Sequence, residues 1–196
     1  MNLPELHIEQ WVAQSDILKK DLSLALLHLN HANEEDYGYY ARSYIRTYAA
    51  YIEGSIWLYK QLIIRAEYQW HKSLPLASQL FLHEYDWKVA SNGALRDKSK
   101  SIPTLDNIRA FFKLMQVLFP ELVVDLSGEG WQSILAFNKK RNSIMHPTKS
   151  DALVVTSKDL EQLKQGVLWF EKVTRGLLVL IKNKIQDEIN QKNETT

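Results

Sequence analysis

The sequence predicts an all-α fold, and three observations support this prediction. Apolar residues recur at helical spacing through most of the chain. Glycine and proline are scarce, with seven and five among 196 residues, and aromatic residues are frequent, with six Trp and nine Tyr. This composition is typical of a packed helical protein. We expect a single domain over residues 1–190, built as a helical bundle of about four principal helices with short accessory helices. The polar residues 191–196 should form a frayed tail.

Each helix follows from a periodic apolar segment between polar or glycine-containing stretches. The expected helices span about 5–31, 36–72, a shorter stretch within 73–90 that starts near Pro75, 104–119, 131–146, and Thr156 or Ser157 to about 190. Asn33 or Asp36 can cap the second helix by accepting its free N–H groups. Residues 91–103 are rich in Ser, Lys and Gly and lack periodicity, which predicts a mobile loop.

Composition also limits the function. The chain has no cysteine, which excludes disulfides, thiolate metal sites and cysteine nucleophiles. The first residues lack the basic and apolar regions of a secretory signal, and no apolar run approaches the ~20 residues of a spanning helix. We therefore expect a cytoplasmic protein with no membrane contact. The net charge of +1 does not indicate a nucleic-acid binder, so any such function must rest on local clustering.

One stretch concentrates chemically useful residues: KKRNSIMHP, residues 139–147. On an ideal helix Ile134, Phe137 and Ile144 all lie within about 60° of Arg141. Arg141 is therefore in the middle of the apolar face, where an unpaired charge is costly. It must be satisfied by a carboxylate, by carbonyl groups, or by a ligand.

His146 lies five residues after Arg141, which would place it about 140° away on an unbroken helix. Pro147 removes this obstacle, because the residue before a proline is driven out of the α region. The helix should end at His146. The imidazole can then turn towards Arg141 or towards a second copy of the protein.

Arginine and histidine together suit chemistry on phosphate. A guanidinium group matches two phosphate oxygens, and an imidazole can accept and donate a proton near neutral pH. Asn142 could donate to an oxyanion or orient the histidine. Lys139, Lys140 and Lys149 add local positive charge that would attract a polyanion, although Lys139 points away from Arg141.

The pattern Arg141-Asn142-Ser143-Ile144-Met145-His146 resembles the R-x-x-x-x-H motif of HEPN (higher eukaryotes and prokaryotes nucleotide-binding) domains. These are small all-α domains, many of which are metal-independent endoribonucleases. YIEGSIWLYK, residues 51–60, also resembles the Glu-containing second helix of many HEPN proteins. The resemblance extends over about 36–190.

The resemblance implies a homodimer that brings two motifs into one composite active site and cleaves RNA without a cofactor or metal. The products would carry 2′,3′-cyclic phosphate and 5′-hydroxyl ends. His146 would act as general base or acid, Arg141 would stabilise the phosphate charge, and Asn142 would assist. It further implies a toxin or an antiviral, abortive-infection effector, with an antitoxin or defence-system partner. Thr148 replaces a tyrosine that one subgroup carries, so regulation through that tyrosine is not expected.

Two alternatives remain open. The first is a catalytically silent HEPN-like bundle that binds RNA or nucleotides or serves as a protein scaffold. The second is an interaction protein in which Arg141 forms a buried structural ion pair.

Other residues allow two interpretations each. Glu53, which shares a helix face with Arg46, could pair with Arg141 and position it, but we favour a contact within its own helix or at the surface. The tyrosines of the second helix could stack bases, but packing is the commoner role. His28, His31 and Glu34 have ligand-like spacing beside an acidic turn, and we expect no metal site there.

Overall fold

The computed structural model describes residues 3–65, 70–89, 91–92, 94–99 and 102–194. Their elements are α1 (Leu3–Asn30), α2 (Glu34–Arg65), the 3-10 helix η1 (Trp70–Ser73), α3 (Leu76–His83), β1 (Tyr85–Val89), β2 (Leu95–Ser99), α4 (Thr104–Leu118), α5 (Glu129–Met145), the 3-10 helix η2 (Ser150–Leu153) and α6 (Ser157–Glu194). The all-α bundle predicted from the sequence is confirmed. No described helix combines the length and apolar character needed to cross a membrane.

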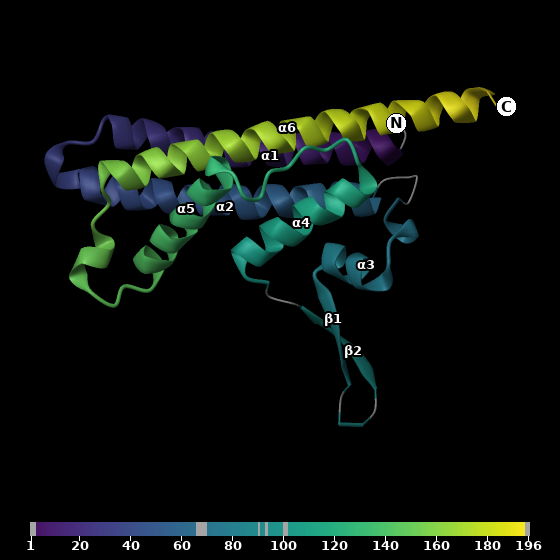
Figure 1. Cartoon of the computed structure of the whole chain (residues 1–196), viewed down its shortest axis with the longest axis horizontal. Helices are drawn as coiled ribbons and strands as arrows, with labels where there is room; N and C mark the ends of the chain where they lie inside the picture. The colour runs from purple at the N-terminus through teal and green to yellow at the C-terminus, as the bar shows by residue number, and fades with distance from the viewer. Residues whose placement is uncertain (1–2, 66–69, 90, 93, 100–101, 195–196) are drawn as a thin grey trace.

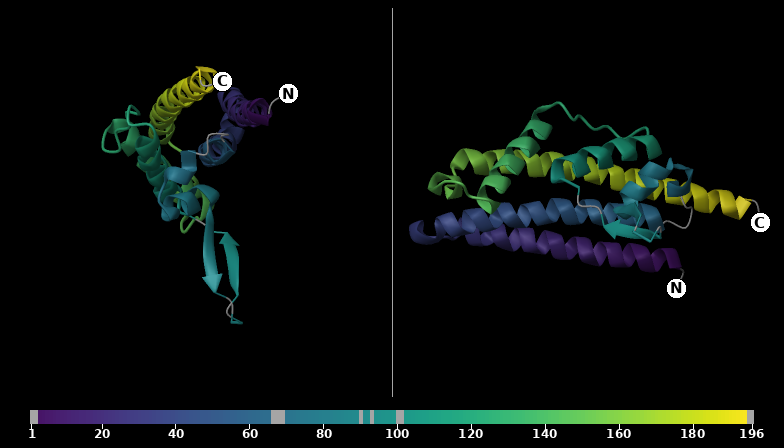
Figure 2. Two further views of the ribbon diagram at one scale, coloured as in Figure 1. Left: turned by 90° about the vertical axis from the view of Figure 1, so that its right-hand side faces the viewer. Right: turned by 90° about the horizontal axis from the view of Figure 1, so that it is seen from below.

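The three longest helices run along one another. Figures 1 and 2 show α1 and α2 as an antiparallel pair, with α6 running alongside them and with α4 and α5 lying across the bundle. The β1–β2 hairpin extends away from this body, as Figure 1 shows. The two strands are antiparallel, with Tyr85 opposite Ser99 and Val89 opposite Leu95.

Helix α2 supplies much of the core. Its fully buried side chains, each at most 1% exposed, are Ala41, Ile45, Tyr48, Ile52, Ile56, Lys60 and Ile63. Aromatic contacts join it to its neighbours: Tyr48 packs on Phe137 of α5, and Tyr51 on Phe170 of α6. The packing role predicted for the tyrosines is confirmed for the buried Tyr44, Tyr48, Tyr51 and Tyr59, whereas Tyr37 and Tyr39 are exposed.

The segment after α2 departs from the sequence-based prediction. The α-helix expected to reach residue 72 ends at Arg65, residues 66–69 lie outside the described part, and 70–73 form η1. The helix expected within 73–90 ends at His83, and the expected loop at 91–103 contains β2. Glu84 redirects the chain because it adopts the left-handed conformation (φ 56°, ψ 30°), which ends α3 and starts the hairpin.

Lys60 holds this redirected segment on the bundle. Its buried ammonium group donates to Glu84 Oε1 at 2.9 Å and to Asn107 Oδ1 at 2.8 Å. Burial lowers the pKa of Lys60, while Glu84 opposes that shift. One buried cation of α2 thus fixes both the end of α3 and the first turn of α4.

The predicted helix caps are present. Asn33 Oδ1 accepts the N–H of Asp36 at 2.8 Å, so Asn33 rather than Asp36 caps α2. Thr156 caps α6, and the helix continues to Glu194, four residues beyond the boundary predicted for the domain.

Gly130 allows α5 to approach α6 closely. A Cβ at this position would lie 2.3 Å from Cγ of Trp169, whereas a Cβ at Gly176 would meet nothing within 4 Å. We predict that Gly130→Ala lowers the free energy of unfolding by about 1–3 kcal/mol through overpacking. Urea denaturation would measure this change.

Gly176→Ala is the matched control, since it adds the same methyl group to an open helix position. It should raise stability by about 0.5–1 kcal/mol through helix propensity. Equal effects of the two substitutions would contradict the close α5–α6 approach.

Candidate active site

Helix α5 ends at the motif as the sequence predicted. Met145 is its last residue, and His146 follows with φ −131° and ψ 67°, outside the α region, in front of Pro147. The His146 N–H still donates to the Asn142 carbonyl oxygen at 2.9 Å, which completes the last turn. The imidazole is exposed. Pro147 therefore produces a fixed backbone turn that leaves the histidine side chain at the surface.

Arg141 is partly buried and paired, with 26% of its side chain exposed. Nη2 lies 3.6 Å from Glu53 Oε1, and Nη1 donates to Asn142 Oδ1 at 3.0 Å. Its position on the inner face of α5 agrees with the buried neighbours Ile134, Phe137 and Ile144. The structure pairs Glu53 with Arg141 of a neighbouring helix, so a contact within its own helix is not what is found. The pair is partly exposed, and a role of Glu53 in positioning Arg141 stays a prediction.

Glu53 joins three helices. Its Oε1 faces Arg141 of α5 and also accepts a hydrogen bond of 2.6 Å from the Thr104 hydroxyl at the start of α4. The Glu53 side chain is 42% exposed, so water weakens the pair, and such ion pairs are worth about 0–1 kcal/mol. The pair can orient the guanidinium group without contributing much to stability. A fully buried structural pair, one of the open alternatives, is not present.

A cleft of about 830 Å³ lies beside this pair, between α2, α5 and the start of α4. Arg141 and Asn142 line it, and His146 does not. The charged residues that line the cleft are three carboxylates and one cation: Glu53, Glu84, Asp106 and Arg141. The buried Lys60 neutralises the charge of Glu84. A polyanion would therefore not lie along this cleft. It would meet Arg141 from the outer end of α5, where Asn142 and His146 are exposed.

The other residues predicted for the site are dispersed. Lys139 and Lys149 are exposed at the end of α5 and before η2, and Arg46 is exposed on α2. Lys140 is instead tied to the start of α6: its ammonium group donates to the Val154 carbonyl oxygen and lies 3.4 Å from Asp159 Oδ2. Lys140 therefore stabilises the α5–α6 connection, and little of its charge remains to attract a polyanion.

Sequence reasoning missed Thr104, Asn138 and Trp57. Asn138 precedes Arg141 by one helical turn, so its spacing could have identified it as a neighbour in the cleft. Thr104 lies 51 residues from Glu53 and carries no local signal. Among the described residues, no three His, Asp or Glu side chains gather in an arrangement that could hold a metal ion.

Comparisons with protein-family models, with curated proteins and with solved structures found no match for this chain.

Asp159 provides a test of the α5–α6 connection. Partial burial raises the pKa of its carboxyl group, but hydrogen bonds from the Thr156 N–H and hydroxyl, together with the Lys140 charge, outweigh this and lower the pKa below the ordinary 3.8. A lowered folded-state pKa stabilises the fold above the ordinary value, and this stabilisation is lost as the pH falls through the folded-state value.

We predict that the free energy of unfolding falls below about pH 4 and that Asp159→Asn reduces the slope of that fall. Urea denaturation at a series of pH values between 5 and 3 would measure it. Asp151→Asn, at an exposed position in η2, is the control. An unchanged slope in Asp159→Asn would contradict the role given to this capping carboxylate.

Proposed function

We propose that this protein is a metal-independent endoribonuclease of the HEPN type. The observation that carries the proposal is the end of α5. There Pro147 ends the helix at an exposed His146, and Glu53 and Asn142 orient the guanidinium group of Arg141 one turn earlier. An oriented guanidinium and an exposed imidazole at the end of one helix are the groups that cleavage of a phosphodiester requires.

The cleavage needs no group beyond those of the protein and the RNA. The RNA 2′-oxygen attacks the adjacent phosphorus and loses its proton to a histidine. The bond from phosphorus to the 5′-oxygen breaks, and this oxygen takes up a proton. The products are a 2′,3′-cyclic phosphate and a 5′-hydroxyl. Arg141 stabilises the charge on the phosphate oxygens, and Asn142 donates to the same oxygens.

The proposed site is composite. Arg141 is partly buried against α2, whereas His146 is exposed past the end of α5, so we assign the two groups of one site to two different chains. Two chains that pair through the ends of α5 would bring two arginines and two histidines together. Each phosphate then meets the arginine of one chain and the histidine of the other. That histidine accepts the proton from the 2′-hydroxyl and passes a proton to the leaving oxygen. We propose a role as a toxin or antiviral effector in the cytoplasm, restrained by an antitoxin or a defence-system partner.

A second candidate is an RNA- or nucleotide-binding scaffold without catalysis. It is favoured by the contacts of Arg141, because the guanidinium group already has an ion-pair partner in Glu53 and a hydrogen-bond acceptor in Asn142. Analysis of the chemical groups at the ends of the RNA distinguishes the two functions, because binding alone cannot create a 2′,3′-cyclic phosphate.

We predict that the purified protein cleaves RNA in the presence of EDTA and that His146→Ala lowers the rate at least 100-fold, as expected for loss of a general acid or base. His31→Ala is the matched control, because it removes an exposed histidine from the end of α1. Gel analysis of RNA fragments, with circular dichroism to verify folding, provides the measurement. Full activity in His146→Ala would contradict the proposal.

Mixing two inactive variants tests the composite site. The Arg141→Ala and His146→Ala chains are unfolded together and refolded, so that half of the dimers contain one chain of each kind. In a mixed dimer one of the two sites keeps both its arginine and its histidine, each from a different chain. The mixture should therefore recover about a quarter of the wild-type cleavage rate. If each site used both residues of the same chain, the mixture would remain inactive, and the shared site would be contradicted.

A further inference from the structure

A second cavity lies on the opposite side of α2 from Glu53 and takes no part in the proposed ribonuclease site. It has a volume of about 350 Å³ and lies between α1, α2 and α6. Its lining residues are Trp11, Ser15 and Lys19 from α1, Tyr51, Ser55, Leu58 and Tyr59 from α2, and Glu171, Thr174, Arg175 and Leu178 from α6. This volume is within the range of small-molecule sites.

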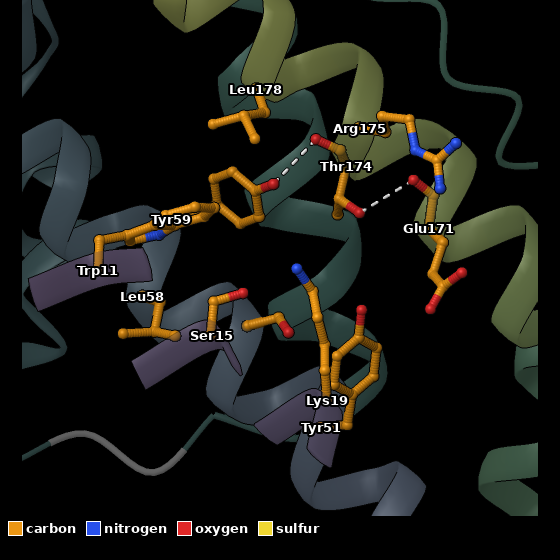
Figure 3. A pocket seen from close by; sticks show the side chains of 11 residues that line it. Trp11, Ser15, Lys19, Tyr51, Leu58, Tyr59, Glu171, Thr174, Arg175 and Leu178 are labelled. Carbon is orange, nitrogen blue, oxygen red and sulfur yellow. Dashed lines mark hydrogen bonds between the residues drawn. The ribbon is translucent and has the colours of Figure 1, made fainter. Parts of the chain in front are cut away.

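One wall of the cavity is aromatic and fixed. The ring of Trp11 meets Tyr59 edge to face, with centroids 5.3 Å apart. The Tyr59 hydroxyl donates to the Thr174 carbonyl oxygen at 2.9 Å, which ties the α2 wall to α6. Figure 3 shows this bond above the open space. Leu58 and Leu178 extend the apolar surface, so a flat apolar group can fill this part of the cavity.

The polar part of the cavity is rich in hydrogen-bond donors. Trp11 Nε1, a group that can only donate, is buried and finds no hydrogen-bond acceptor among the residues that the structure describes. In Figure 3 the Lys19 ammonium group and the Ser15 hydroxyl point into the space between the helices. Within the described part of the chain, Lys19 makes one loose ion pair, with Asp16 at 3.9 Å, and 57% of its side chain is exposed. A buried donor without an acceptor lowers stability, and an acceptor atom in the cavity would remove that cost.

The charges of the lining favour an anion. Lys19 and Arg175 are cations and Glu171 is the one anion among the eleven lining residues, which leaves a formal charge of +1. Burial and the neighbouring Glu171 raise the pKa of Tyr51 to about 12, and the Tyr51 hydroxyl interacts with Glu171 and Ser55.

We propose that the cavity between α1, α2 and α6 binds a small flat apolar molecule that carries a single carboxylate. The ring of the ligand packs against Tyr59 and Leu178. Its carboxylate accepts from the N–H of Trp11 and from Lys19 and Arg175, which neutralises the single positive charge of the site. Glu171 disfavours dianions, since a second negative charge would find no free cation. This proposal does not depend on the ribonuclease activity.

Binding of phenylpropionate is the test, with phenylpropionamide and phenylpropylamine as neutral and cationic probes of the same shape. Titration calorimetry on the full chain measures the affinities, and proton–nitrogen correlation spectra follow the indole N–H of Trp11, assigned through Trp11→Phe. We expect the carboxylate to bind about tenfold more tightly than the amide, as charge-assisted hydrogen bonds imply, and to shift the Trp11 signal.

Two variants localise the binding. Arg175→Gln should weaken phenylpropionate binding about tenfold, whereas Lys182→Gln, which removes a charge from the exposed side of α6 outside the cavity, should not change it. Circular dichroism verifies that both variants fold. No binding of phenylpropionate, equal affinity for the amide, tighter binding of the amine, or equal effects of the two variants would each overturn the proposal.

Discussion

The position of α2 at the centre of the bundle is the constraint on which the other features depend. Its apolar stripe is fully buried, so each remaining side of the helix faces a different neighbour. Glu53 faces α4 and α5, Tyr51 and Tyr59 face α1 and α6, and Lys60 holds the end of α3. A rotation of α2 by one residue would displace all three sets of contacts at once. Both the candidate active site and the second cavity are therefore positioned by the packing of one helix.

Two of the polar contacts that α2 makes with its neighbours differ in strength. Lys60 is fully buried and has two partners at less than 3 Å, so it fixes its neighbours firmly. Glu53 and Arg141 are partly exposed and 3.6 Å apart, which makes their pair weak and easily exchanged. A weak pair suits the role proposed for Arg141, because an incoming anion can compete for the guanidinium group.

Local patterns predicted much of the fold. Periodicity located the helices, Asn33 and Thr156 located two of their starts, and Pro147 located the end of α5. The sequence does contain a hairpin signal, because Tyr85, Trp87 and Val89 alternate with polar residues ahead of the dipeptide Asn92-Gly93. The hairpin was missed because this dipeptide was interpreted as part of a loop. The left-handed Glu84 that separates α3 from β1 is held by the distant Lys60, and no local pattern indicates such a contact.

The candidate active site was predictable only in part, because it too depends on contacts between residues that are far apart in the sequence. Helical geometry placed Arg141 on the inner face of α5 and required a partner, but it could not choose between candidates on other helices. The assignment of Glu53 and Thr104 depends on how α2, α4 and α5 cross, and long-range packing determines that. Lys140 was assigned to substrate attraction because its neighbours are basic, whereas its contact with Asp159 depends on the turn back into α6.

The central claim is that Glu53 orients Arg141 for phosphate chemistry and does not hold the fold together. A double-mutant cycle of Glu53→Gln and Arg141→Lys, measured both in urea unfolding and in RNA cleavage, tests it most directly. The account predicts a coupling below about 1 kcal/mol in unfolding and a larger coupling in the cleavage rate. A coupling of several kcal/mol in unfolding with none in cleavage would contradict it and make the pair purely structural.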